Sequence, residues 1–370
     1  MRYKFKYKPY EHQLEALKRS WNKKEFAYFM DMGTGKSKVL IDNMCVLYDR
    51  GEITGALIVA PKGVYRNWEQ GELPTHIPEH VMYDTVLWNP SQTKTQLEKQ
   101  NKLYVVDDNL KIFVMNVEAF STKKGCEAAE RFLNAHPSLM VIDESTTIKN
   151  KDAKRTKSIV KIGKVAQYRR ILTGSPVTKS PMDLYTQAEF LDEWLLGHSS
   201  FFSFQYEYAI VQRRSMGAHS FNQVVGYRNL DKLNGILENF SYRVKKDDCL
   251  DLPDKVYIKR SVELTEEQKS VYNSLKTFAL ALLEDGSVTT DTILTQLLRL
   301  QQVCSGHVKM DDGEMKTFNS AKLPELMSVL EEVDGKVIIW ANFTHDIKTI
   351  EQEISKMYGA ETVATYYGET

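Results

Sequence analysis

The sequence is poor in several features that would each define a class of protein. It has four cysteines in 370 residues, none of them in a CxxC pair, which argues against a disulfide framework and predicts no structural zinc. The first ten residues, MRYKFKYKPY, lack the apolar core of a secretion signal. No later run approaches the roughly 18 apolar residues of a membrane span. These absences predict a soluble intracellular protein with no membrane partner.

The chain also lacks an excess of charge of either sign. Its 49 basic and 49 acidic residues cancel, so it is neither a polycation nor an acidic tail. Any surface that binds nucleic acid must therefore be a local patch. A length of 370 residues exceeds what one hydrophobic core usually serves, which predicts two domains.

Short apolar runs that end in turn or polar residues dominate the first half of the chain. They read as almost continuously buried strands, and the stretches between them are long enough for crossover helices. This pattern predicts an α/β fold with a parallel sheet and helices on both faces. The runs are EFAYFM (25–30), GALIVAP (55–61), KIFVMNV (111–117), LMVIDES (139–145) and RRILTGSP (169–176).

The pattern changes after residue 182. Residues 182–245 are aromatic and helix-like with no clear strand, and we interpret them as a helical extension of the first domain. Residues 243–255 are charged and contain Pro253, which favours a linker.

A second α/β lobe begins further along the chain. Thr265 and Gln268 form a capping-box pattern before an amphipathic helix. GKVIIWANF (335–343) and ETVATYYG (361–368) predict strands, and the sequence ends two residues later. We therefore interpret the second lobe as incomplete, in a fragment or an unusually short protein.

The loop MGTGKS follows one of the predicted strands and opens a predicted helix, the context in which a GKS signal is meaningful. Gly33, Thr34 and Gly35 would direct backbone N–H groups at phosphate oxygens, with help from the helix dipole. Lys36 would reach the β and γ phosphates, and Ser37 would bind Mg²⁺. The pattern thus predicts an ATP and magnesium site.

This loop departs from the general GxxxxGK[ST] pattern at its first position, which is Met30. A glycine turn with a solvated lysine is the alternative interpretation. A second site favours the nucleotide: VIDES (141–145) ends a predicted strand in two carboxylates, where Asp143 would hold Mg²⁺ and Glu144 would orient and deprotonate the attacking water. Upstream, the Gln13 amide offers a donor and an acceptor that suit adenine.

Read in order, these segments resemble the motifs of the superfamily 2 helicases, and more narrowly the Swi/Snf-type double-stranded DNA translocases of the compact bacterial or phage kind. The resemblance implies two RecA-like lobes with ATP and Mg²⁺ in the cleft and duplex DNA across the top, in a bacterial cytosol or a phage-infected cell. It assigns 1–245 to the first lobe and 246–370 to a linker, a helical segment and the incomplete second lobe. The segments that carry it are Gln13, MDMGTGKS (30–37), LIVAPKGVYRNW (57–68), VMNVEAF (114–120), VIDESTTIKN (141–150), LTGSPVTKSPMDLY (172–185), YRVKKDDCLDLPDK (242–255), LTQLLRLQQVCSGH (294–307), SAKLPELMSVL (320–330) and KVIIWANFTHDI (336–347).

Further roles follow from the resemblance alone. Thr173 and Ser175, in the place of the family's TGTP, would sense the nucleotide state and couple it to DNA. Lys62, Asn116 and Lys149 lie at or beside the motifs through which family members touch the phosphate backbone.

Two departures qualify the activity that the resemblance implies. The DEAH or DEGH of motif II reads DEST, so the histidine that links it to motif III is lost and the link would run through Ser145 or Thr146. The family's motif V and its arginine-bearing motif VI are expected beyond residue 370, and without that arginine the transition state lacks a stabiliser that contributes about 10³ to 10⁵ in rate. A slow DNA-dependent ATPase is expected. The alternatives are a nucleotide- and DNA-binding module with little turnover, or a helicase that separates RNA or DNA strands.

Two aromatic features have modest expectations. RYKFKYK (2–8) alternates basic and aromatic residues. We interpret it as a half-buried edge strand, and a DNA-binding strap is the less favoured alternative. Trp68 is expected to anchor the core or the lobe surface.

Overall fold

The computed structural model describes residues 3–91, 93–216, 219–251, 253–284, 290–310 and 313–368. The chain divides into two units, one up to Pro253 and one from Asp254 onward. Among the described helices, none has the length and apolar character that crossing a bilayer requires.

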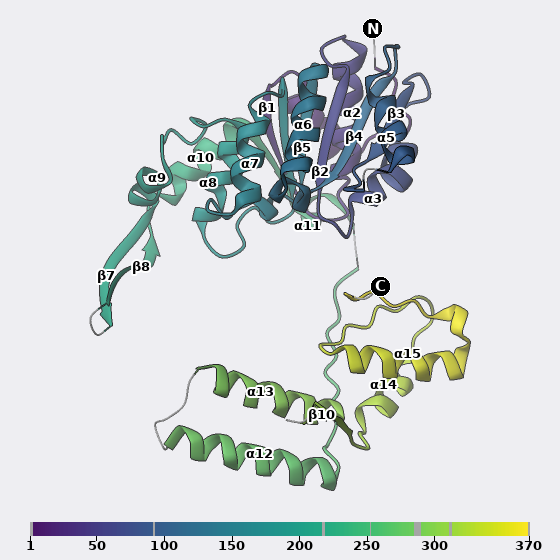
Figure 1. The fold of residues 1–370 in the computed structure, drawn as a ribbon, viewed down its shortest axis with the longest axis vertical. Coiled ribbons are helices and arrows are strands. Elements are labelled where there is room, and N and C mark those ends of the chain that lie inside the picture. The colour runs from purple at the N-terminus through teal and green to yellow at the C-terminus, as the bar shows by residue number, and fades with distance from the viewer. Residues whose placement is uncertain are drawn as a thin grey trace. The chain divides into compact units, whose positions relative to one another are not determined.

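The first unit is built on a seven-stranded sheet in which every pair of neighbouring strands is parallel. Helices cover both of its faces (Figure 1), as the alternation of apolar runs and helical stretches predicts. The strands, in spatial order, are β3 (Tyr83–Leu87), β4 (Leu110–Asn116), β2 (Gly55–Ala60), β5 (Ser138–Asp143), β6 (Tyr168–Thr173), β1 (Glu25–Met30) and β9 (Ser241–Val244).

Two hydrophobic cores lie on opposite faces of this sheet, because successive side chains of a strand point in opposite directions. In β1, Ala27 and Phe29 join one core, whereas Phe26 and Tyr28 join the other. The helices of this unit are α1 (Glu11–Ser20), α2 (Lys36–Asp49), α3 (Tyr65–Asn67), the π-helical turn Trp68–Glu72, α4 (Leu73–His76), α5 (Lys94–Asn101), α6 (Lys123–Ala135), α7 (Lys154–Gly163), α8 (Leu184–Leu191), α9 (Phe201–Tyr208), α10 (Leu230–Phe240) and α11 (Lys246–Cys249).

Residues 182–245 contain strands that the sequence reading did not predict. After α9 the chain forms an antiparallel hairpin of β7 (Ala209–Met216) and β8 (His219–Tyr227). After α10 it adds β9 to the edge of the main sheet beside β1. The expectation of an extension without strands is wrong, because Phe, Tyr and Val suit a helix face and a strand equally well in a short run.

The basic and aromatic start of the chain is not an edge strand. Residues 3–10 form no strand, yet Tyr3 and Phe5 pack against a core of the sheet. Tyr3 donates a hydrogen bond to Asp42 (3.0 Å), and Lys6 donates to the carbonyl of Pro74 (2.6 Å). Tyr3 and Phe5 are therefore half-buried without a strand partner, whereas Tyr7 is exposed.

The second unit is helical with a small two-stranded sheet. Its elements are α12 (Glu266–Glu284), α13 (Thr290–Ser305), β10 (His307–Lys309), β11 (Met315–Thr317), α14 (Lys322–Glu331) and α15 (Thr344–Tyr358). The predicted capping box is confirmed: Thr265 N–H donates to Gln268 Oε1 (3.1 Å), and Gln268 N–H donates to Thr265 Oγ1 (3.3 Å).

The strands predicted at 335–343 and 361–368 are absent from the described residues of this unit. In the first run, Ile338 and Trp340 are 81% and 91% exposed. A strand forms only beside another strand that shares its hydrogen bonds, and no described strand pairs with either run.

A buried arginine joins the sheet to the first helix. Arg170, in β6, has no exposed surface, and its guanidinium donates five hydrogen bonds of 2.7–3.0 Å. The acceptors are Asn43 Oδ1 and the carbonyls of Ser20, Lys23, Lys24 and Arg169. These carbonyls include the end of α1 and the turn into β1. Arg170 thus satisfies backbone groups that would otherwise be buried without partners.

We expect Arg170→Met to lower the free energy of unfolding by about 3–5 kcal/mol, because it strips several buried acceptors of their donor. Arg169→Met is the matched control: its side chain is partly exposed and pairs only with Glu25, so the loss should be about 1 kcal/mol or less. Urea unfolding midpoints at equal slope measure both. Equal losses in the two variants would contradict the role assigned to Arg170.

Candidate active site

The predicted site residues gather at one edge of the sheet of the first unit. Because its strands are all parallel, their carboxyl ends meet at the same edge. The glycine loop follows β1, and the two acids close β5. Thr173 is the last residue of β6, which lies between these two strands.

The glycine loop has the backbone of a phosphate cradle. Gly33 and Gly35 have positive φ angles of 84° and 86°, and Gly35 caps α2, of which Lys36 is the first residue. A Cβ on Gly35 would lie 2.2 Å from Gln13 Nε2, so only glycine fits there. The N–H groups at the start of α2 have no partner inside the helix, which makes this end suited to an anion.

Gln13 is buried against this loop. Its Nε2 donates to the carbonyl of Thr34 (3.1 Å), and its Oε1 accepts from the N–H of Tyr10 (3.0 Å). His12 Nε2 lies 2.9 Å from the same Thr34 oxygen. One N–H and one lone pair of the Gln13 amide remain for a base. Gln13 therefore tethers α1 to the loop and keeps a free edge.

Asp143 is the most perturbed acid of the site. Burial raises its pKa to about 6, and the neighbouring charge of Glu144 acts in the same direction. A hydrogen bond from Trp68 Nε1 to Asp143 Oδ2 (3.0 Å) and the positive charge of Lys36 oppose the rise. Lys36 thus lies close enough to Asp143 to act on it electrostatically, which brings the glycine loop and the β5 acids into one site.

Glu144 has an unusual backbone. Its φ of 49° and ψ of 62° lie in the left-handed region, which a residue with a Cβ rarely adopts. Its N–H donates to Asp143 Oδ1 (3.0 Å), and its carboxylate accepts from Thr173 Oγ1 at 3.4 Å. Thr173 Oγ1 also accepts from the N–H of Ser175 (3.2 Å). The turn therefore brings Glu144 to Thr173, and Thr173 connects it to Ser175.

These residues fit a magnesium-bound triphosphate by their chemistry. A buried carboxylate with a raised pKa is stabilised by a nearby divalent cation, and Asp143 is such a group. Ser37 lies in the first turn of α2, beside Lys36 and the glycine cradle. Ser37 and Asp143 could hold the metal, while Lys36 and the loop N–H groups could hold phosphate.

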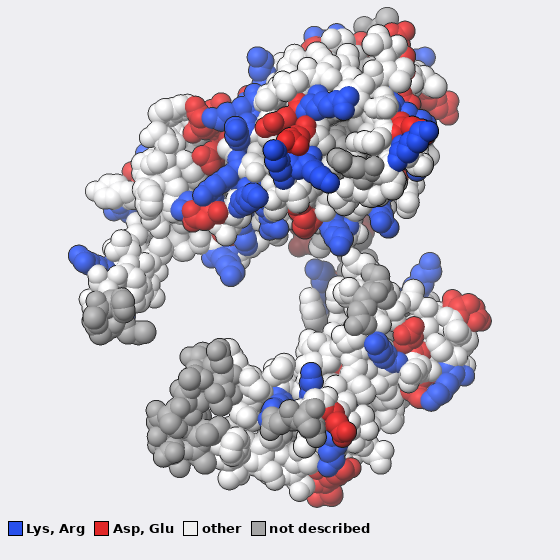
Figure 2. All heavy atoms as spheres, viewed as in Figure 1, with Lys and Arg blue, Asp and Glu red and all other residues white. Residues whose placement is uncertain are grey.

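The three predicted DNA contacts lie on the same edge of the sheet. Lys62 is exposed in the turn after β2, and Asn116 is the last residue of β4. Lys149 follows β5, where its Nζ donates to Thr178 Oγ1 and lies 4.0 Å from an Asp183 oxygen. Lys62 is thus more available to a phosphate than Lys149. Figure 2 shows further Lys and Arg side chains over this unit, interspersed with acids.

Sequence reasoning missed two groups at this site. The first is Trp68, confirmed as a core residue at 2% exposure, which also holds Asp143. The second is Lys246 of α11: its N–H donates to Asp31 Oδ2 (3.0 Å), and its Cε lies 3.2 Å from where a Gly33 Cβ would stand. The charged run KKDD (245–248) was a signal of Lys246 in the sequence, although we interpreted it as part of a linker.

Ser145 does provide a link from motif II to the segment after β6. Its Oγ donates to Gln187 Oε1 (2.6 Å), and both side chains are fully buried. Gln187 Nε2 in turn donates to the carbonyls of Pro176 (2.8 Å) and Asp183 (2.7 Å). This chain connects the turn that holds Glu144 to the loop that follows Thr173, in a motif that lacks the usual histidine.

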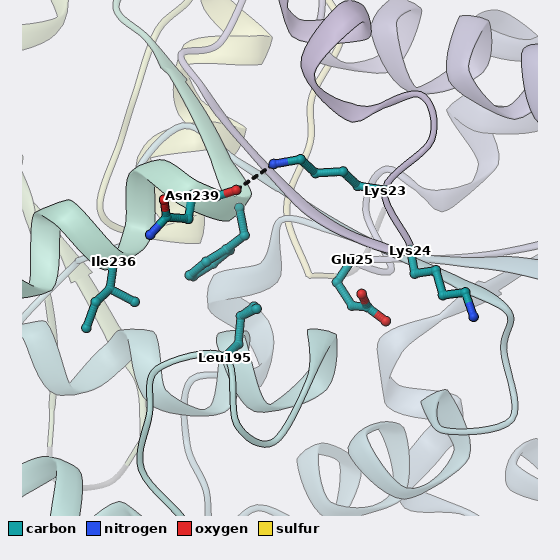
Figure 3. Close-up of a pocket in the computed structure, with 7 residues that line it drawn as sticks. Lys23, Lys24, Glu25, Leu195, Ile236 and Asn239 are labelled. Carbon is teal, nitrogen blue, oxygen red and sulfur yellow. Dashed lines mark hydrogen bonds between the residues drawn. The ribbon is translucent and has the colours of Figure 1, made fainter.

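A cavity lies away from this site, and the described residues contain no cluster of metal-binding side chains. A cavity of about 370 Å³ lies beside Lys23, Lys24 and Glu25, at the opposite end of β1 from the glycine loop (Figure 3). Lys23 there donates to the carbonyl of Asn239 (2.6 Å). Among the described residues, no group of three His, Cys, Asp or Glu side chains could hold a metal ion.

We expect Ser145→Ala and Gln187→Leu each to destabilise the first unit, by about 1–3 kcal/mol, because each leaves a buried polar group unpaired. The double variant should lose about 1 kcal/mol less than the sum of the two, since the pair is removed together. Ser241→Ala is a control, because its hydroxyl donates to the backbone carbonyl of Leu237, at the end of the preceding helix α10. Strict additivity in urea unfolding would contradict the link.

Comparisons with known proteins show the family of the chain. The family profile of the SNF2-related domain matches residues 17–309. The chain is 25% identical to the CHD3-type chromatin-remodeling factor PICKLE of Arabidopsis thaliana over 93% of its length, and 24% identical to the putative ATP-dependent helicase/translocase YwqA of Bacillus subtilis over 89%. It spans 26% and 34% of those relatives.

A solved structure shares the fold. It is titled Sulfolobus solfataricus SWI2/SNF2 ATPase core in complex with dsDNA, and the match has a TM-score of 0.52 and 23% identity over 96% of this chain and 71% of that one. The prediction of a RecA-like α/β fold is confirmed by this likeness and by the parallel sheet. The chain therefore belongs to the SNF2-related domain family, the Swi/Snf-type group of superfamily 2 that the order of its motifs resembles.

Proposed function

We propose that this chain hydrolyses ATP with Mg²⁺ and uses the energy to move along double-stranded DNA. One observation carries the proposal. The charge of Lys36, at the glycine loop, acts on the buried Asp143, which directly precedes Glu144. An ammonium group, a metal-type carboxylate and a candidate base thus share one site at the start of a helix. Nucleotide hydrolysis requires this combination.

The chain's own residues divide the work of hydrolysis. The N–H groups from Gly33 to Ser37 and the ammonium of Lys36 bind and neutralise the β and γ phosphates. Glu144 orients the attacking water and accepts its proton, and the Thr173 hydroxyl fixes the position of that carboxylate. Ser37 and Asp143 would hold Mg²⁺, which would stabilise negative charge on the phosphates.

DNA is the proposed track. Lys62, Asn116 and Lys149 share the edge of the sheet with the nucleotide site, so a change at Glu144 and Thr173 is transmitted over a short path. Relatives named as chromatin-remodeling factors and as a helicase/translocase support this choice, as does a solved relative titled as a complex with dsDNA. A bacterial or phage-infected cytosol is the proposed location, and the Bacillus subtilis relative supports its bacterial form.

Turnover of the isolated chain should be slow and should rise with added duplex DNA. Glu144→Gln should lower the turnover by about a hundredfold or more while ATP still binds, because only the proton acceptor is lost. Lys36→Ala should weaken ATP binding itself. Glu127→Gln and Lys123→Ala on the exposed face of α6 are the matched controls, and a phosphate-release assay measures all four.

Two results would redirect this proposal. A rate that survives Glu144→Gln would show that the base is wrongly assigned. Tight binding of ATP and DNA with no turnover, even with DNA present, would favour the alternative of a binding module.

Binding to duplex DNA should weaken steeply as salt rises, since phosphate contacts release counterions. Lys62→Ala should weaken binding for any sequence and lower the salt slope by about 0.9, which corresponds to one phosphate contact. Lys161→Ala, in the last turn of α7 and therefore toward the amino end of β6, should change neither quantity. Fluorescence anisotropy over a salt series measures both, and an unchanged slope in Lys62→Ala would remove Lys62 from the DNA track.

A further inference from the structure

The β7–β8 hairpin extends away from the sheet of the first unit (Figure 1). Its base is firmly held: Arg228 N–H donates to the carbonyl of Tyr208 (3.0 Å), and Asn229 Nδ2 donates to that of Glu207 (3.0 Å). Tyr208 and Ala209 are buried in a core of the sheet. The hairpin is thus an arm on a rigid base.

Most of the arm beyond this base has no packing partner. The described side chains from Ile210 to Ser215 are all exposed, as are Ser220 to Gln223 on the other strand. An isolated two-stranded ribbon is only marginally stable in water. A ribbon exposed on both faces, with Phe221 at 49% exposure, indicates a surface that another molecule covers.

The charge of the arm is of one sign. From Tyr208 to Leu230 the sequence contains no Asp or Glu, whereas it contains Arg213, Arg214 and Arg228. The chain as a whole has equal numbers of acids and bases, so an acid-free stretch is a local patch. In Figure 2 the described surface of the arm shows Lys or Arg and no acid. The complementary partner is a polyanion.

The register separates the arm into two faces. Val211, opposite Val224, lies on one face together with Arg213, opposite Asn222. Val224 packs against the core, and Arg213 donates to Ser220 Oγ (3.0 Å), so this face is partly occupied. The other face carries two cross-strand pairs of hydrogen-bonding and aromatic side chains with no partner recorded among the described residues: Gln212 with Gln223, and Arg214 with Phe221.

We propose that this second face, which we call the Arg214 face, binds double-stranded DNA as a contact additional to the carboxyl edge of the sheet. The proposal rests on the proposed function, because it names a second contact on the same track. An arginine and two glutamines are donors for phosphates and base edges, and Phe221 packs on sugar or base. An eight-residue strand spans about 26 Å, enough to cross a major groove about 12 Å wide.

The test uses the full chain and a fluorescently labelled DNA duplex, titrated between about 50 and 200 mM salt. Arg214→Ala should weaken binding about tenfold, since a charge-assisted hydrogen bond contributes on that order. It should also lower the salt slope by about 0.9. Phe221→Ala should weaken binding while leaving the salt slope unchanged. Arg213→Ala, which removes the same charge from the opposite face, is the matched control and should change the affinity by about twofold or less, since its guanidinium already has a partner.

The outcomes separate this proposal from the proposed function. If the unaltered chain binds the duplex and Arg214→Ala binds equally well, the arm is not a DNA contact, although the translocase proposal stands. Equal losses in Arg213→Ala and Arg214→Ala would overturn the assignment to one face. If Arg214→Ala instead alters only self-association in sedimentation, the arm binds a second copy. If the unaltered chain binds no duplex, both proposals fail. Basal ATP turnover without DNA should be the same in every variant.

Discussion

The common direction of seven strands is the constraint on which the rest of the structure depends. Residues more than a hundred positions apart, such as Lys36 and Asp143, become neighbours only because the strands before them end at one edge. The interior of the sheet is apolar on both faces, which fixes each strand in register, since a slip of one residue would exchange its two faces. The chemistry at the edge is thus positioned by packing in the middle.

Burial and a neighbouring negative charge make ionisation of Asp143 at that edge unfavourable. Asp143 is buried beside Glu144, and burial together with the neighbouring negative charge raises the pKa of Asp143. The hydrogen bond from Trp68 and the charge of Lys36 offset part of the cost of ionising Asp143, and a bound cation would offset more. The left-handed backbone of Glu144 adds local strain, which the surrounding hydrogen bonds hold in place. Binding of a positively charged ligand, such as a metal ion, at this edge of the sheet is therefore favoured.

Local rules explain which parts the sequence could predict. The glycine loop and the acidic pair are each formed by residues that are adjacent in the sequence. Residues 33–37 and 143–144 could therefore be predicted from the sequence alone. Gln187 and Trp68 could not, because their partners lie 42 and 75 positions away and depend on packing. The runs at 335–343 and 361–368 have strand composition, yet pairing is a property of two segments. The hairpin was not predicted because the composition of its short runs does not distinguish a helix from a strand.

The buried guanidinium of Arg170 has a consequence for how the protein tolerates acid. Its acceptors are peptide carbonyls and one amide, none of which takes up a proton in the ordinary range of pH. The ion pair of Lys38 with Asp42 is different, because burial raises the pKa of that carboxyl, so it takes up a proton at a higher pH than an exposed aspartate does. The charge on α2 therefore changes with acidity, whereas the hydrogen bonds that join α1, β1 and β6 keep both of their partners.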